Sequence, residues 1–183
     1  MCRYGFTTYK SHFACFTCRK TFKQPHFADL LKRIGKWQYY EKLKRKPLTV
    51  LTEKERLQIE ELEKNYRDRS VKCPQCGEYM ADLGLDFKSP GKSAENEWKI
   101  IKGLYTIGRS FYSCGCNGIG YIPQHPLDYQ IYLNNILQEY ENSIAYYQNK
   151  TIKEYPDKTE RITYWSQNAA TVKAEIAKQK SER

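Results

Sequence analysis

The chain has 183 residues, which is enough for one domain with a sizeable core or for two small modules. It holds no run of about 18 apolar residues and no apolar stretch near its start, so we expect a cytoplasmic protein that does not contact a membrane. Thiols stay reduced in that compartment, so the seven cysteines favour metal binding or catalysis over disulfides.

The positive charge is concentrated near the N-terminus. Residues 1–50 carry 12 Lys and Arg but 2 Asp and Glu, whereas residues 51–183 carry 19 of each kind. The whole formal excess of +10 therefore lies in the first quarter of the chain. This asymmetry indicates a polyanionic partner, most often a nucleic acid, and the alternative is a solvated basic face.

The first elements follow from composition and periodicity. Residues 3–24 are rich in aromatic and β-branched side chains and predict strands joined by a turn at CFTC, residues 15–18. From Phe27 to Trp37, apolar residues recur at every third or fourth position, which predicts a helix. Gly35 is expected to weaken this helix slightly.

The next elements are a linker, a helix and short strands. The basic run KLKRKP, residues 42–47, predicts a linker. A second helix should begin after Thr52, which forms a capping box with Glu55, and should end near Asp68. The stretch that contains CPQCG, residues 70–87, then predicts short strands with Gly and Pro turns.

The C-terminal part is expected to be largely helical. Residues 94–108 predict a short helix, and residues 109–123 predict strand and turn. Apolar residues recur with helical spacing over 129–147 and again over 162–176, with a polar joint at 149–157. These two stripes predict a helical hairpin whose apolar faces pack together.

The cysteines carry the strongest chemical signal. They form three close pairs and leave Cys2 apart: Cys15 with Cys18, Cys73 with Cys76, and Cys114 with Cys116. In CPQCG, the two-residue gap lets both thiolates turn towards one ion, and the proline and glycine permit a tight turn. Two strand-flanked CxxC turns therefore predict one four-thiolate site, and zinc accepts four such ligands tetrahedrally without redox chemistry.

The two CxxC turns resemble those of the zinc ribbon, a family of small sheets clipped by two cysteine turns. The resemblance covers two pieces, near residues 10–24 and 68–88, and it implies that their four cysteines bind one zinc ion. The 54 residues between Cys18 and Cys73 exceed the usual separation. Their ends can still meet, because the cost of loop closure grows only with the logarithm of length.

The spacing leaves two other arrangements open. Cys73 and Cys76 can share an ion with Cys114 and Cys116, which follow after a gap of 37 residues in a tighter CxC turn. Alternatively, a second ion can use Cys114 and Cys116 with two further ligands drawn from Cys2, His12, His26 and His125. A thioredoxin-like redox role is disfavoured, because both CxxC pairs run into polar strand-like segments and not into a helix.

The order of motifs also resembles that of small uncharacterised bacterial proteins. In those proteins a CxxC turn, CPxCG, a DFKxP stretch and a late SCGC turn follow one another. The resemblance implies a bacterial zinc-binding module and brings no activity with it.

Aromatic and basic residues alternate in KWQYYEKLKRK, residues 36–46, and this combination is typical of segments that hold single-stranded or looped RNA. Cations around the first cysteine turn would meet phosphates, which position an RNA without specifying its sequence. Trp37 also fits the apolar helix stripe. The predicted nucleic-acid contacts are Lys10, Arg19, Lys20, Lys23, Lys36, Trp37, Tyr40, Lys44, Arg45 and Lys46.

Together these features predict an α+β fold. A zinc-ribbon-like β module, residues 1–126 with a helical insertion at 27–68, should be followed by an antiparallel helical hairpin at 127–183. The sequence contains no phosphate loop, HExxH, GxSxG or Rossmann motif, so enzymatic activity is not expected. We expect a nonenzymatic, zinc-stabilised RNA-binding protein associated with the ribosome. The alternative is a protein–protein adaptor that presents the Tyr-rich hairpin on a zinc scaffold.

Overall fold

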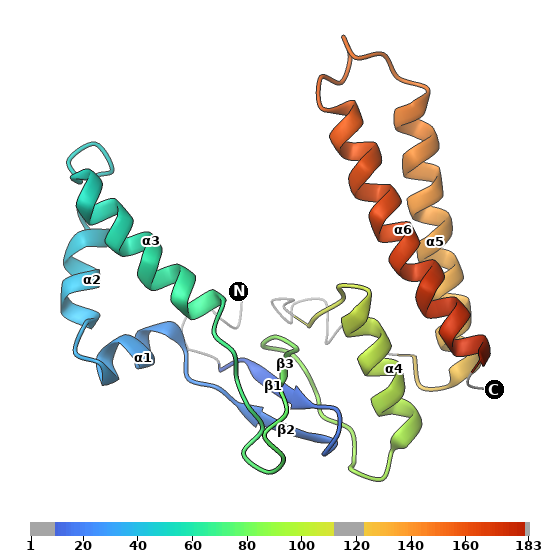
Figure 1. Ribbon diagram of the computed structural model, residues 1–183, viewed down its shortest axis with the longest axis horizontal. Helices are drawn as coiled ribbons and strands as arrows, with labels where there is room; N and C mark the ends of the chain where they lie inside the picture. Colours follow the sequence, from blue (N-terminus) through green and yellow to red (C-terminus); the bar gives the residue numbers. More distant parts are fainter. Residues whose placement is uncertain (1–9, 112–122, 182–183) are drawn as a thin grey trace, which may run out of the picture. The chain divides into compact units, whose positions relative to one another are not determined.

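The computed structural model describes residues 10–111 and 123–181 (Figure 1). Over these residues the protein is a mixed α/β structure with six helices and one three-stranded antiparallel sheet, as the sequence predicted at this level. The described residues form two compact units. Residues 10–89 and Phe111 make up the N-terminal unit, and residues 90–110 and 123–181 make up the helical unit.

The sheet of the N-terminal unit is small. It consists of β1 (His12–Cys15), β2 (Lys20–Lys23) and β3 (Ala81–Asp82), in the order β2-β1-β3. β1 and β2 form a hairpin, and β3 pairs with the other side of β1. Phe111 extends this side, since its N–H donates to the carbonyl oxygen of Leu83 at 2.8 Å.

Three helices lie between β2 and β3 in the sequence: α1 (Phe27–Arg33), α2 (Trp37–Lys44) and α3 (Glu53–Arg67). The single helix expected through Trp37 is therefore wrong. Gly35 has a φ of 70°, and Gly35 and Lys36 donate their N–H groups to the carbonyls of Lys32 and Leu31. This is the Schellman pattern that ends a helix at a left-handed glycine, so the chain starts afresh as α2.

The predicted linker at 42–47 is also partly helical. α2 continues to Lys44 because Leu43 is buried in a cluster with Leu51 and Ile59. The capping box expected at the start of α3 is confirmed: Thr52 accepts from the N–H of Glu55, and the Glu55 carboxylate accepts from the N–H of Thr52.

The helical unit contains α4 (Glu95–Thr106), α5 (Pro126–Gln148) and α6 (Lys158–Ser181). α5 and α6 lie side by side as an antiparallel hairpin (Figure 1), and α4 packs against both. The apolar residues of the two predicted stripes are most deeply buried in the part of the hairpin that contacts α4. The fully buried members of the stripes are Tyr129, Leu133, Ile136, Ala169 and Val172.

A close junction joins the three helices of this unit. Tyr129 of α5 donates its hydroxyl hydrogen to Glu175 of α6 at 3.3 Å, and both side chains are buried. Burial, followed by the negative charge of Glu175, raises the pKa of Tyr129. Gly103 of α4 lies against this pair, where a Cβ atom would overlap both side chains. The glycine therefore sets how closely α4 can approach the hairpin.

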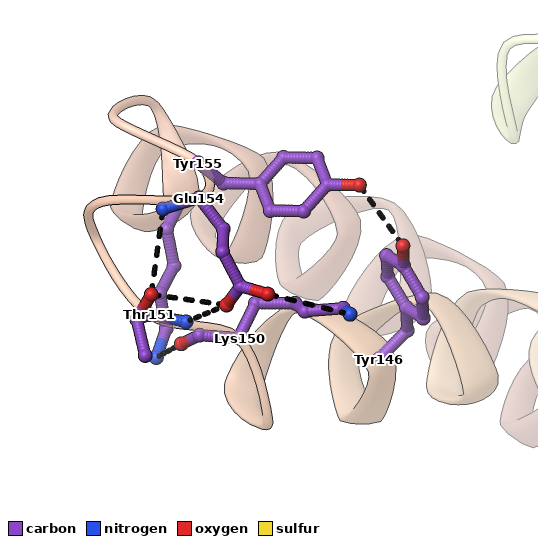
Figure 2. A network of polar contacts seen from close by, with 6 residues as sticks. Tyr146, Lys150, Thr151, Glu154 and Tyr155 are labelled. Atoms are coloured by element: carbon purple, nitrogen blue, oxygen red, sulfur yellow. Dashed lines mark hydrogen bonds and ion pairs between the residues drawn. The ribbon is translucent and has the colours of Figure 1, made fainter.

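The turn of the hairpin is held by a polar network (Figure 2). Thr151 and Glu154 cap one another, with N–H to carboxylate and N–H to hydroxyl distances of 2.9 and 3.4 Å. The hydroxyl oxygens of Tyr146 and Tyr155 lie 2.9 Å apart, and Lys150 reaches towards Glu154 at 3.8 Å. These contacts fix the joint between the two long helices.

Among the described helices, none combines the length and apolar character needed to cross a bilayer.

Candidate metal centre

Two cysteine turns in the N-terminal unit have the same local design. Cys15 ends β1, and the chain turns through Cys18 before β2 begins at Lys20. In the second turn, Cys73 donates its N–H to the carbonyl of Glu78 at 2.8 Å and accepts at its own carbonyl from Gly77 at 2.9 Å. Each CxxC therefore sits at the end of a short antiparallel pair of segments.

The residue that follows each CxxC adopts a left-handed backbone. The φ angle is 53° at Arg19 and 78° at Gly77. Arg19 is the single described residue other than glycine with a positive φ. Because this region is costly for a residue with a Cβ atom, the first turn holds Arg19 in a conformation that its sequence does not favour.

The two turns bring four thiols together although 54 residues separate them. The Sγ atoms of Cys15, Cys18, Cys73 and Cys76 all lie within 4.8 Å of one another. Each turn also contacts the other directly, with 3.5 Å between the Sγ atoms of Cys15 and Cys76 and 3.9 Å between those of Cys18 and Cys73. Such a cluster is able to hold a metal ion.

The cluster lies against one end of the sheet. Cys15 and Cys73 are buried and pack with Phe13 and Met80, whereas Cys76 is exposed. The apolar side shields the site from water and excludes other ligands there, and the opposite side stays accessible for an ion to enter. Cys15 and Cys73 thus belong both to this apolar cluster and to the candidate metal centre.

Hydrogen bonds to sulfur stabilise negative charge in both turns. The N–H of Cys18 donates to the Sγ of Cys15 at 3.4 Å. Burial opposes ionisation of Cys73, but the backbone N–H groups of Gln75 and Cys76 outweigh it and lower the pKa of Cys73 to about 7. Amide donors of this kind are the usual support for metal-bound thiolates.

The pKa values of Cys15 and Cys18 shift in the opposite direction. The neighbouring Cys76 thiol, followed by burial, raises the pKa of Cys18 to about 12, and burial raises the pKa of Cys15. Four sulfurs this close repel one another as anions, so they cannot all ionise unless a cation lies among them. The electrostatics of the cluster therefore match a site that is completed by a metal ion.

The remaining cysteines cannot be placed relative to this cluster. Cys2, Cys114 and Cys116 lie outside the described residues, as does the whole late SCGC turn at 113–116. Over residues 10–111 and 123–181, the four-cysteine group is the one set of three or more His, Cys, Asp and Glu side chains placed to share a metal.

The three histidines have structural positions. The His12 Nδ1 lies 3.3 Å from the carbonyl oxygen of Gly84. His26 caps α1 by accepting from the N–H of Ala28 at 3.3 Å, and His125 is the N-cap residue of α5. A second metal site that uses them would need ligands outside the described residues.

The structure divides the predicted nucleic-acid contacts into two groups. In the first group, each side chain contacts an acidic neighbour: Lys44 pairs with Glu63 at 3.1 Å, Arg45 with Glu41 at 2.8 Å, and Lys46 with Glu55 at 2.7 Å. Much of the basic run is therefore neutralised within the N-terminal unit. Sequence patterning did not find these partners, because Glu55 and Glu63 lie on a different helix.

The predicted stacking residues are also engaged. Tyr40 donates to Glu63 at 2.7 Å, and its ring meets Phe27 edge-on with centroids 5.0 Å apart. Trp37 is half-buried, with its ring 6.1 Å from that of Tyr40 and Lys32 above it at 5.6 Å. Both rings serve the packing of α1, α2 and α3.

The second group remains exposed. Lys20 and Lys23 lie on β2 at the edge of the sheet, Lys10 precedes β1, and Lys36 lies between α1 and α2. None of these four lysines forms an ion pair with another described residue. Arg19, the remaining candidate, is half-buried in the first cysteine turn.

Comparison with known proteins adds no relative. No protein-family model matches the chain, and neither the curated proteins nor the solved structures contain a significant match.

Proposed function

We propose that the protein is a zinc-stabilised, nonenzymatic RNA-binding protein. The observation that carries the metal part is the convergence of four cysteine sulfurs from two matching turns. The observation that supports the RNA part is the set of exposed lysines on β2, beside the first of these turns. The metal would hold together the surface that contacts the RNA.

Zinc is the metal that we propose for the cluster. A tetrahedral ion with Zn–S bonds of about 2.3 Å places its sulfurs about 3.8 Å apart. The separations of 3.5 and 3.9 Å between the turns are close to that value. Four protein ligands leave no open position for water or substrate, which is the property of a structural site and not of a catalytic one.

The experiment for the metal is elemental analysis together with native mass spectrometry of protein purified without chelator. We expect one zinc ion bound by the two CxxC turns. Cys15→Ser and Cys73→Ser should lose zinc equally, because their sulfurs belong to one site. Cys114→Ser is the matched control and should keep that ion. Loss with Cys73→Ser and Cys114→Ser but not with Cys15→Ser would contradict the proposed ligand set, and bound iron would contradict the metal.

Several features support RNA as the partner. The formal charge excess of +10 lies in residues 1–50, and ion pairs within the N-terminal unit leave the lysines near the cysteine turn exposed. Lys20 and Lys23 stand at the two ends of β2, about 10 Å apart along a strand. Side chains three positions apart leave opposite faces of a strand, so an RNA that contacts both lysines would pass around the exposed edge of β2.

The RNA experiment is a titration of single-stranded RNA at several salt concentrations. Lys20→Glu with Lys23→Glu should weaken binding across sequences and reduce the slope of log affinity against log salt by about 1.4, or about 0.7 per contact. Lys99→Glu with Lys153→Glu changes the same charge on exposed residues of the helical unit and should have little effect. Equal losses in both variants would indicate nonspecific attraction without a defined site.

A second candidate function is that of a protein adaptor. The observation that favours it is the number of large apolar side chains that the hairpin leaves in water, including Ile131, Ile152 and Tyr164, each at least half exposed. Such residues are enriched at protein interfaces. If the intact protein does not bind RNA at moderate salt, the adaptor becomes the better hypothesis.

A further inference from the structure

A groove of about 610 Å³ lies over α3 and beside segment 44–51 of the N-terminal unit. Its apolar lining comes from Leu51 and Ile59, which are buried, and from Leu48, which is 76% exposed. Leu48 is held in place because Arg56 donates to its carbonyl oxygen at 2.8 Å. The groove thus has an apolar floor and one apolar wall that nothing in the described chain covers.

The rim of the groove is basic. Its lining includes the cations Lys44, Lys46, Arg56 and Arg67 and the acids Glu60 and Glu63. Acidic neighbours already pair with Lys44 and Lys46. Arg56 bonds to a neutral carbonyl, and Arg67 forms no ion pair with another described residue, although its charge also acts on Glu63. These two guanidinium groups outnumber Glu60, the one lining acid that no described lysine pairs with, so the rim keeps a positive excess for a ligand.

The spacing of these groups defines the shape of the ligand. Arg56, Ile59, Glu63 and Arg67 recur with helical periodicity, so they share one face of α3. Arg56 and Arg67 are 11 residues apart, which corresponds to about 16 Å along the helix. A complementary ligand therefore has an apolar middle and negative charges about three helical turns apart.

We propose that this groove binds an acidic amphipathic helix of a partner protein. Apolar side chains of that helix would contact Leu48, Leu51 and Ile59, and its acidic side chains would face Arg56 and Arg67. This is the helix-in-groove mode, in which a few apolar anchors enter a cleft and rim charges set orientation. The inference is independent of the proposed RNA contact at β2.

The lining distinguishes this ligand from RNA. Single-stranded RNA is held by aromatic rings on which its bases stack, and no residue of the groove is aromatic. Tyr40 was predicted to stack on RNA bases, but its hydroxyl group donates to Glu63 and its ring packs against Phe27. An aliphatic floor between separated guanidinium groups suits leucine-like side chains flanked by carboxylates.

The test is selection of binders from a phage-displayed library of random peptides of about 16 residues, with the zinc-loaded full chain immobilised. We expect enriched peptides to combine carboxylates with apolar residues at helical spacing. Their affinity for the intact protein would then be measured by fluorescence anisotropy with synthetic copies. Peptides without this pattern, or no enrichment at all, would overturn the proposal.

Variants locate the binding. Arg56→Glu with Arg67→Glu should weaken the selected peptides about tenfold or more, because like charges then meet across the interface. Leu48→Asp should do the same without harming the fold, since Leu48 is largely exposed. Lys42→Glu with Lys54→Glu is the matched control: both residues are exposed, belong to α2 and α3, and lie outside the groove.

Two outcomes separate this inference from the proposed function. Lys20→Glu with Lys23→Glu should retain peptide binding while it loses RNA binding, which keeps the two sites distinct. A single-stranded RNA that displaces the peptide, and whose own binding requires Leu48 and Arg67, would assign the groove to nucleic acid and overturn the proposal. Peptide binding that survives both groove variants would also overturn it.

Discussion

The two units of the protein reach stability by different routes. The N-terminal unit has strands of four, four and two residues, and its buried side chains include two small clusters, one at the cysteines and one between α2 and α3. The helical unit has helices of 23 and 24 residues that pack along one another and are joined by α4.

The difference shows what the cysteines contribute. A sheet this small buries little apolar surface to offset the loss of chain entropy, and the metal that we propose for the four cysteines would supply free energy through cross-links between distant turns. Two long amphipathic helices bury a continuous stripe and need no such cross-link. The two units should therefore respond oppositely to changes in metal and in apolar packing.

Metal removal is the largest expected effect. A strong chelator, or Cys73→Ser, should unfold the sheet and both cysteine turns, because binding of the proposed zinc ion to the thiolates would be part of the folding free energy of this unit. Acid should act in the same direction, since protons compete with the metal for thiolates. Hydrogen exchange followed by mass spectrometry should show fast exchange in β1 to β3 and unchanged protection in α5 and α6. Unchanged protection in β1 to β3 after metal removal would contradict the metal's role.

An unpaired charge in the stripe should give the converse result. Ile136 is buried between the hairpin helices, and Ile136→Asp should destabilise the helical unit by about 3–5 kcal/mol. Chemical denaturation followed by circular dichroism measures this loss, and zinc content should not change. Asn135→Asp places the same charge on the adjacent exposed position as a control. A neutral Ile136→Asp would mean that the stripe is not buried.

The close approach of α4 should be sensitive to one added methyl group. Gly103→Ala would overlap the ends of the Tyr129 and Glu175 side chains, which are buried and bonded to one another, so at least one of them must shift and we expect a loss of about 1–3 kcal/mol. Adding Tyr129→Phe removes the overlapping hydroxyl oxygen and should recover part of the loss. Gly91→Ala adds a methyl group in open space and should change little. Equal effects of the two glycine substitutions in thermal melts would show that packing at Gly103 is loose.

Substitutions at the left-handed residue of each cysteine turn should change stability by a smaller amount and in opposite directions. Gly77→Ala should cost about 1–2 kcal/mol, entirely from its left-handed backbone, because no atom lies near the added Cβ. Arg19→Gly should stabilise the first turn by up to about 1 kcal/mol, because glycine tolerates the positive φ that arginine resists. Melting temperatures of the zinc-loaded variants test both signs. Shifts in the same direction would show that the turns are not equivalent.

The contact between α2 and α3 gives the smallest effect. The hydrogen bond from Tyr40, followed by that from Lys44, lowers the pKa of Glu63 below its ordinary value. The carboxylate therefore adds stability above the unfolded pKa, and this contribution is lost as pH falls through the folded pKa. Glu63→Gln should cost less than about 1 kcal/mol at pH 7.

The stability difference between Glu63→Gln and the unmodified protein should disappear in acid, where the natural side chain is itself neutral. The comparison between the two proteins at each pH is the relevant measurement, because zinc release affects both equally. A difference that persists unchanged below pH 4 would indicate a contribution from shape and not from charge.

Much of the secondary structure follows from local sequence. The capping box of Thr52 and Glu55 sets the start of α3, and the apolar periods of 129–147 and 162–176 set the faces of the hairpin. These signals are visible because each depends on residues within one or two turns of one another. Gly35 was the exception. It was expected only to weaken a helix, whereas its left-handed backbone ends α1.

Other features depended on contacts between distant residues. In the sequence, α4 falls within the segment 1–126 that was predicted to form the β module. In the structure it belongs to the same compact unit as the hairpin. The reason is Gly103, whose missing side chain fits the Tyr129–Glu175 pair. Likewise, the aromatic and basic segment 36–46 was predicted to contact RNA, but Lys44 and Lys46 pair with Glu63 and Glu55 of α3.

The sequence by itself determined the two CxxC turns, because a thiol pair two residues apart needs only a local reversal of the chain. Only the tertiary structure decided that Cys15 and Cys18 meet Cys73 and Cys76, and which cations of the basic segment have their charge balanced by acidic neighbours. The physical reason is the 54-residue excursion between the turns. No local pattern encodes where its ends meet, since that depends on the pairing of β1 with both β2 and β3.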